Sequence, residues 1–198
     1  MSPTTRILRT TVLAVALVAT PAMASVAPAS ATTNNCSTVW GSLGKSGAAA
    51  GEQGLQFLLN VRSGQHPCYD RVVFDLTGND SGPVGYSVDY VDAVTNEATG
   101  ELVPLVGGAR LRVVIAQGSF DYVSQSSAYN PADPARLVDV TGYRTLRQVA
   151  SADTFNEADS TTTIGIGVRA RLPMRAFLLP SASQFFGQRL VIDIAHHW

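Results

Sequence analysis

From Leu55 onward, the sequence consists of short apolar runs separated by turn-forming residues. Gly, Pro, Asn and Asp fill the gaps and supply turn conformations that strands do not adopt. The runs recur about every ten residues, which is typical of an all-β sandwich rather than a parallel α/β fold. We therefore expect a two-sheet β-sandwich, with strands over 54–61, 71–77, 85–91, 102–106, 110–116, 136–143, 146–155, 161–170, 175–179 and 189–194.

The N-terminus has the order of an export signal. Arg6 and Arg9 precede an uncharged stretch rich in Val, Leu and Ala, and Ala24 and Ala31 each end an A-x-A cleavage site. We expect a signal peptide over 1–31, cleaved after residue 24 or 31. The alternative is a membrane anchor, but the stretch of about eleven apolar residues is shorter than the roughly twenty that span a bilayer. We therefore expect a secreted protein, extracellular or cell-wall associated, with no membrane insertion after cleavage.

Cleavage leaves a chain of about 165 to 175 residues, which is the usual size of one domain. Its first part, 32–54, is polar and rich in glycine, and we expect it to form an arm. The sandwich domain then occupies 55–198. Both Arg6 and Arg9 lie in the signal, so 12 basic residues remain against 15 acidic ones. Nucleic acid is not an expected partner, because its phosphates require a basic face.

The chain has two cysteines, Cys36 and Cys68. In the oxidising environment outside the membrane we expect them to pair. A disulfide that closes a loop of about 33 residues stabilises a fold by about 3 to 4 kcal/mol in the chain-entropy model. It would tie the arm to the first strand, and Trp40 is expected to be buried against the core near it.

One pattern, R-h-h-h-D-h with h apolar, occurs at both 71–76 and 189–194. Strand alternation places the Arg and Asp of each copy on one face, about 13 Å apart, so they do not pair within a strand. If the two strands are antiparallel neighbours, Arg71 meets Asp193 and Asp75 meets Arg189. Opposite charges across a strand pair are favourable, so we predict antiparallel pairing and these structural ion pairs.

The segment 62–71 gathers several side chains that recognise sugars and carboxylates by hydrogen bonding and stacking. We consider these as ligand-binding candidates: Arg62, His66, Tyr69, Asp70 and Arg71. The alternative is that His66, Asp70 and Arg71 form a structural network that orders the turn into the first core strand.

Catalytic signatures are incomplete. The chain has no G-x-S-x-G motif, and the S-x-x-K string at 42–45 lacks its K-T-G companion because Lys45 is the only lysine. The three histidines, His66, His196 and His197, do not form a metal-site pattern. We therefore expect no catalytic residues, no metal and no cofactor.

Six blocks stand in order along nearly the whole mature chain: W-G-S-L-G-K-S at 40–46, R-S-G-Q-H-P-C-Y-D-R-V-V-F-D at 62–75, G-Y-S-V-D-Y-V at 85–91, G-G-A-R-L at 107–111, I-G-I-G-V at 164–168 and R-L-V-I-D-I-A-H at 189–196. In these blocks the chain resembles the AMIN-like domain family of secreted actinobacterial proteins, which is distantly similar to the AMIN domain of cell-wall amidases. The resemblance implies a β-sandwich that binds peptidoglycan or envelope partners. It carries over no catalytic residue.

The leading functional hypothesis is thus a non-catalytic cell-envelope binding module that contacts peptidoglycan or a surface glycopolymer. Its partner would be a cell-wall glycan or an envelope protein. Two alternatives remain open: a secreted protein-interaction or inhibitor domain, which would use loops such as 122–136, and an unrecognised hydrolase or lyase with His66 and a carboxylate in a deep pocket.

Overall fold

The computed structural model describes residues 36, 39–49, 57–77, 83–121, 124–153, 161–180 and 187–198. All of them belong to one unit, Asn34–Trp198. The predicted signal peptide, 1–31, lies outside these residues. Within the described ranges the chain forms strands and loops without a helix, so no helix there is able to span a bilayer.

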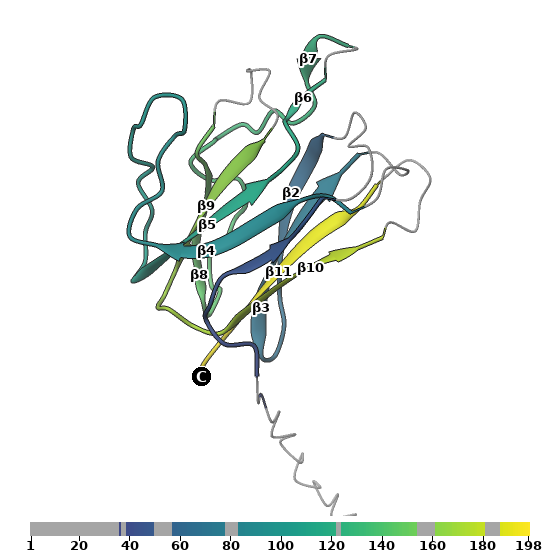
Figure 1. Cartoon of the computed structure of the whole chain (residues 1–198). Coiled ribbons are helices and arrows are strands. Elements are labelled where there is room, and N and C mark those ends of the chain that lie inside the picture. Colours follow the sequence, from purple (N-terminus) through teal and green to yellow (C-terminus); the bar gives the residue numbers. More distant parts are fainter. Residues whose placement is uncertain are drawn as a thin grey trace, which may run out of the picture. The chain divides into compact units, whose positions relative to one another are not determined.

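The strands form two antiparallel sheets that pack face to face (Figure 1), so the predicted all-β sandwich is confirmed. The five-stranded sheet has the order β1 (Lys45–Gly47), β4 (Tyr86–Val91), β5 (Ala109–Ile115), β9 (Thr162–Val168) and β8 (Leu146–Ser151). The four-stranded sheet has the order β10 (Met174–Leu179), β11 (Arg189–Ala195), β3 (Tyr69–Leu76) and β2 (Leu58–Gln65). A short ribbon pairs β6 (Phe120–Asp121) with β7 (Ser126–Ser127).

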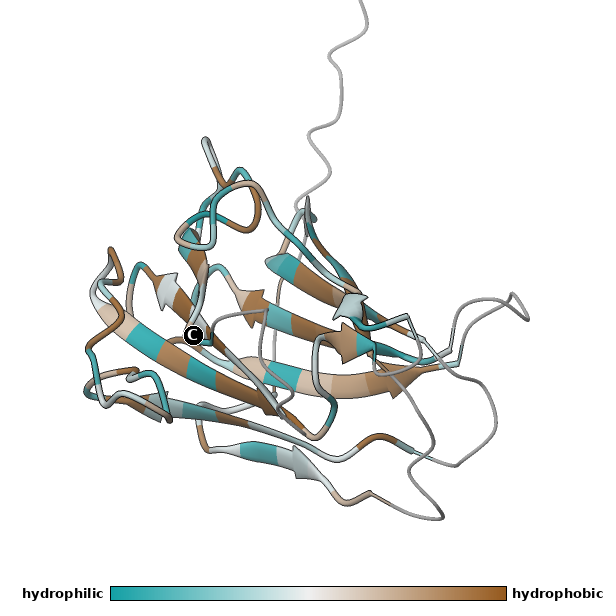
Figure 2. Cartoon of the chain, turned by 90° about the horizontal axis from the view of Figure 1, so that it is seen from above, coloured by the Kyte–Doolittle hydropathy of each residue, from teal (hydrophilic) through white to brown (hydrophobic). Residues whose placement is uncertain are grey.

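The core lies between the sheets and follows from alternation along the strands, visible as apolar and polar bands in Figure 2. On β3, Val72, Phe74 and Leu76 are fully buried, and the alternate positions of β5 and β11 contribute Leu and Ile side chains to the same cluster. Each such side chain stabilises the fold by about 1.5 to 3 kcal/mol relative to leaving it in water.

The arm closes one side of the sandwich. Cys36 and Cys68 form the predicted disulfide, with their Cα atoms 5.1 Å apart. The carbonyl of Gly41 then accepts a hydrogen bond from the backbone of Met174 at the edge of the four-stranded sheet. Lys45–Gly47 continues as β1 and pairs with β4 at the edge of the five-stranded sheet. The arm thus links the edges of both sheets.

Strand β9 is buried on both faces. Ile164, Ile166 and Val168 face the core, while Gly165 and Gly167 face outward. A Cβ at Gly167 would lie 2.1 Å from the carbonyl oxygen of Val106, and one at Gly165 would lie 2.7 Å from the Leu105 side chain. The I-G-I-G-V block therefore lets the segment 103–108 lie directly on the outer face of the five-stranded sheet.

Two predicted strands are wrong. The segment 102–106 forms only one isolated bridge, between Thr95 and Leu102. The segment lies on β9 instead: Leu105 is buried in a small outer cluster and Val103 packs against that cluster, while Leu102 and Val106 are exposed. The segment 136–143 contains turns, such as the one closed by the hydrogen bond from Tyr143 to Val140. The segment lies beside β8, where the backbone N–H of Leu137 donates a hydrogen bond to the carbonyl of Val149.

Candidate functional site

The outer face of the four-stranded sheet carries most of the predicted ligand-binding residues. On β3, the alternation that sends Val72 and Phe74 into the core turns Tyr69, Arg71 and Asp75 outward. Arg62 lies opposite Val73 in the register and therefore shares this face. His66 lies in the turn before β3 and stacks on Tyr69, with ring centroids 4.4 Å apart.

The two R-h-h-h-D-h strands are antiparallel neighbours, with Arg71 opposite Asp193, as the repeat predicts. The Asp193 carboxylate is fully buried and accepts two hydrogen bonds from Arg71, at 2.6 and 2.9 Å. These bonds raise the pKa of Arg71 above its usual value, so its guanidinium remains charged. Arg175, opposite Asp193 on β10, adds two further contacts of 2.8 Å to Oδ2.

The second predicted ion pair is not formed. Asp75 and Arg189 are opposite each other in the register, but the Asp75 carboxylate is held by Arg62 at 2.8 and 3.0 Å. Arg189 instead donates to the carbonyl of Pro180. Arg62, on the neighbouring strand β2, binds Asp75 with two guanidinium nitrogens, one on each carboxylate oxygen. The predicted register of β3 against β11 is thus correct, but it does not determine which arginine binds Asp75.

Aromatic rings surround the arginines at Asp193. The guanidinium carbon of Arg175 lies 4.3 Å from the ring centroid of Trp40, 5.2 Å from that of Phe177 and 5.5 Å from that of Tyr69. Trp40 contacts Tyr69 edge to face, at 5.6 Å. We call these five residues and Asp193 the aromatic–arginine cluster: Trp40, Tyr69, Arg71, Arg175, Phe177 and Asp193. The expectation that Trp40 is buried against the core is wrong, because Trp40 lies half-buried on the outer face of this sheet.

Sequence reasoning missed Arg175 and Phe177. They lie about a hundred residues after Arg71, and only the register of β10 against β11 brings them to Asp193. One signal was available: the segment 175–179 was a predicted strand, so Arg175 and Phe177 share a face by alternation.

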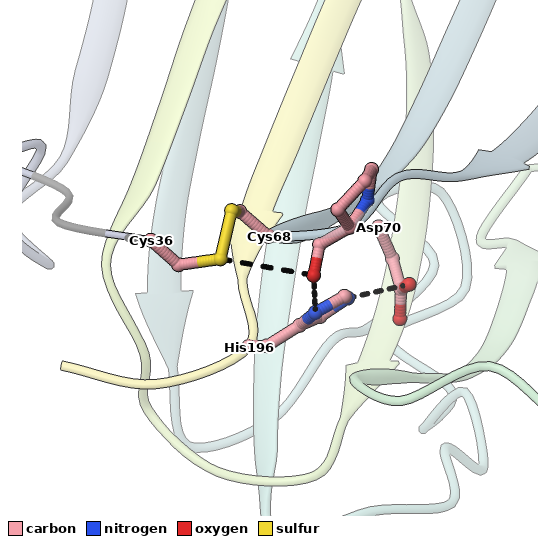
Figure 3. Close-up of a disulfide and its surroundings, with 5 residues drawn as sticks. Cys36, Cys68, Asp70 and His196 are labelled. Atoms are coloured by element: carbon pink, nitrogen blue, oxygen red, sulfur yellow. Dashed lines mark hydrogen bonds and ion pairs between the residues drawn. A yellow bond between two sulfur atoms is a disulfide. The ribbon is translucent and has the colours of Figure 1, made fainter. Parts of the chain in front are cut away.

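Asp70 points the other way, into the molecule. It is fully buried, and its Oδ2 accepts hydrogen bonds from the backbone of Thr145 and Leu146, at 2.5 and 3.1 Å. Its Oδ1 lies 3.0 Å from His196 Nε2, while His196 Nδ1 lies 3.2 Å from the carbonyl of Pro67. Figure 3 shows the His196 ring beside the disulfide with Asp70 next to it. Asp70 is thus buried in a structural network with His196, Thr145 and Leu146, not with His66 and Arg71 as the alternative interpretation predicts, and it is not placed to contact a ligand.

A cleft of about 1220 Å³ opens elsewhere, beside β8 and the loops around 92–106 and 135–143. Its wall includes Arg110, Arg136 and Asp139, and it does not include His66. A side-chain hydrogen bond from Thr141 lowers the pKa of Asp139, which favours the ionised carboxylate. Leu102 and Val106 line the same cleft and are 69% and 64% exposed.

The other sequence-level candidates have structural contacts. Ser42 of the S-x-x-K string accepts hydrogen bonds from Arg171, and Lys45 donates to the carbonyl of Leu43. Among the residues that the structure describes, no group of three or more His, Cys, Asp or Glu side chains is placed to hold a metal ion.

Comparison with known proteins gives one finding. A family model described as the AMIN-like domain matches residues 56–196, which include both sheets except β1. No curated protein and no solved structure matches the chain. AMIN-like domains are associated in general with binding at the cell wall and with an extracellular or cell-wall location. The match covers more than half of the sequence, and the chain therefore belongs to the AMIN-like domain family.

Proposed function

We propose that this chain is a secreted, non-catalytic module that binds the cell envelope through its aromatic–arginine cluster, with peptidoglycan or a surface glycopolymer as ligand. The observation that carries the proposal is the Arg175 side chain, which is 40% exposed and whose guanidinium carbon lies within 6 Å of three ring centroids. Aromatic faces and guanidinium forks are the groups with which proteins bind sugar rings and their polar substituents.

Two features support export. The N-terminal sequence has the charged, apolar and small-residue order of a signal peptide. The Cys36–Cys68 disulfide is a bond that persists in oxidising compartments and is rare in the cytosol.

The contacts of the reactive side chains support the non-catalytic part of the proposal. The Asp70 carboxylate contacts His196 and two backbone N–H groups inside the fold, and both His196 nitrogens face acceptors. The cleft wall contains the Asp92 and Asp139 carboxylates but no histidine or cysteine. A hydrolase would need a general base beside its nucleophile or a bound metal in such a cleft.

The proposal is tested by co-sedimentation of the purified mature protein with protein-free peptidoglycan sacculi, at low and at moderate salt. We expect retention at both. Trp40→Ala should weaken it about three- to tenfold, because it removes one ring of the cluster. Trp198→Ala is the matched control, since Trp198 is exposed and makes no ring contact with the cluster. Absence of retention of the unmodified protein at both salt concentrations would refute the proposal.

The cleft favours a second candidate function, a protein-interaction or inhibitor domain. Leu102 and Val106 expose large apolar side chains at its wall, which is typical of surfaces that bind another protein. The double variant Leu102→Ser/Val106→Ser separates the two functions. If it abolishes retention on protein-containing envelopes while Trp40→Ala does not, the interaction function is supported.

A further inference from the structure

We infer that the aromatic–arginine cluster selects an acidic glycan, with Arg175 binding an oxyanion carried by a sugar ring that lies on the aromatic rings. This inference rests on the proposed function, because it names the ligand class of the same site.

At Asp193, one buried carboxylate binds two guanidinium groups, those of Arg71 and Arg175. Asp193 neutralises one of the two positive charges, so the cluster retains a net charge of about +1. A charge that is partly withdrawn from water attracts an anion more strongly than a fully hydrated one. The cluster is thus completed electrostatically by an anionic group from outside.

The two arginines differ in how they bind Asp193 and in their exposure. Arg71 uses Nε and Nη2 on separate oxygens of Asp193, and its side chain is 23% exposed. Arg175 places Nε and Nη2 on the same oxygen, and its side chain is 40% exposed. Within the described part of the chain, Nη1 donates to no residue in either arginine, so geometry at Asp193 and exposure separate their roles. Arg71 holds both oxygens of the buried carboxylate, and the more exposed Arg175 has the donor that a ligand reaches.

Trp40, Tyr69 and Phe177 present half-buried aromatic faces around Arg175. A neutral sugar could stack on these rings but would leave the surplus charge uncompensated, and a small inorganic anion would leave the rings uncovered. A sugar ring that carries a carboxylate covers the aromatic rings and also compensates the surplus charge, because the guanidinium fork matches a carboxylate geometrically.

The rest of the sheet face has the same sign. The outward-facing charged residues of β2, β3, β10 and β11 are four arginines, Arg62, Arg71, Arg175 and Arg189, against two carboxylates, Asp75 and Asp193. The whole chain has a formal net charge of −1, so positive charge is concentrated on this face. Such a concentration attracts polyanions and suits an acidic polymer better than a neutral one.

The test compares three soluble polymers by titration calorimetry with the mature protein. Polygalacturonate has rings and carboxylates, dextran has rings without charge, and polyphosphate has charge without rings. We expect polygalacturonate to bind most tightly and its affinity to fall as salt rises. Equal affinity for dextran, or tighter binding of polyphosphate, would overturn the inference.

The decisive variant is Arg175→Gln, which should weaken polygalacturonate binding about tenfold or more, because it removes a charge-assisted contact. The fold should persist, since Arg71 still binds Asp193 through two hydrogen bonds, and an unchanged circular dichroism spectrum would establish this. Arg112→Gln is the matched control: it removes the same charge from an exposed position on β5 in the other sheet, and it should change affinity less than twofold. Equal losses in both variants would contradict a specific role for Arg175.

The sacculus assay keeps the two proposals distinguishable. If the unmodified protein binds sacculi but shows no preference for polygalacturonate, the proposed function stands and the acidic-glycan inference falls. If polygalacturonate binds through Arg175 but sacculi are not retained, the ligand class stands and peptidoglycan is excluded as the source of the ligand.

Discussion

On the five-stranded sheet the outer face of β9 is covered by the protein's own segment 103–108, whereas the outer face of the four-stranded sheet carries guanidinium groups and aromatic rings. The first face has glycines at Gly165 and Gly167, which admit the segment 103–108 at contact distance. The second has Arg71 and Arg175 bound to one buried carboxylate. The glycines of the I-G-I-G-V block thus serve packing within the fold. The charged residues around the R-h-h-h-D-h strands leave polar groups available to a ligand.

The largest effect is expected when one Gly→Ala substitution is made on the outer face of each sheet and the two variants are compared. Gly167→Ala places a Cβ 2.1 Å from the carbonyl oxygen of Val106, so backbone must move, and we expect a loss of about 3 kcal/mol in the free energy of unfolding. Gly64→Ala lies on β2 with nothing within 4 Å of the added Cβ. It should be neutral or stabilising by up to about 1 kcal/mol. Urea unfolding measures both values.

If Gly167→Ala and Gly64→Ala have equal free energies of unfolding, the segment 103–108 does not pack on β9 as closely as described. Gly165→Ala provides an intermediate case, because its added Cβ meets the flexible end of the Leu105 side chain rather than backbone. Its loss should therefore be smaller than that of Gly167→Ala. All three variants should retain binding to sacculi in the folded state, since none of them removes a residue of the aromatic–arginine cluster.

Asp193 is the buried carboxylate beneath the outer face of the four-stranded sheet. Asp193→Ala leaves Arg71 and Arg175 side by side without a counter-charge. Removing one partner of a buried ion pair costs about 3 to 5 kcal/mol, and the partial exposure of both arginines reduces this to about 2 kcal/mol here. Because the remaining repulsion is between charges that solvent reaches, about 1 M salt should recover part of the loss.

Asp89→Ala is the control for Asp193→Ala. Asp89 is a half-buried carboxylate opposite Arg112 in the five-stranded sheet. Its removal should cost less than about 1 kcal/mol. If thermal unfolding shows the same loss for both variants, Asp193 does not have the organising role that its burial and its two arginines indicate.

The sequence predicted the parts of the fold that depend on local alternation. Most of the strand segments, the disulfide and the antiparallel register of Arg71 against Asp193 follow from the pattern of apolar residues along the chain or from the cysteine count. The same alternation also implied that Asp70, next to Arg71, faces inward, although this residue was treated as a ligand-binding candidate. It bonds to His196 and Thr145 instead.

The remaining features depend on contacts between distant segments. The segment 102–106 has the apolar composition of a strand, but it lies across Gly165 and Gly167 without pairing, and of its large side chains Leu105 is the one that is buried. Trp40, Arg71 and Arg175 meet only after both the arm and β10 are placed. A single sequence contains the residue types of this cluster, but their approach to one another is set by tertiary packing.

The smallest effect is expected for Arg62, which lies on the outer face of the four-stranded sheet but outside the aromatic–arginine cluster. Its guanidinium forms two hydrogen bonds with Asp75, and its side chain is 48% exposed. Surface ion pairs contribute about 0 to 1 kcal/mol, so Arg62→Gln should lower the free energy of unfolding by less than about 1 kcal/mol. It should also weaken polygalacturonate binding far less than Arg175→Gln, although both variants lose one positive charge from the same sheet face. Titration calorimetry of the two variants side by side decides whether the ligand responds to the summed charge of this face or to the one guanidinium that lies among the rings.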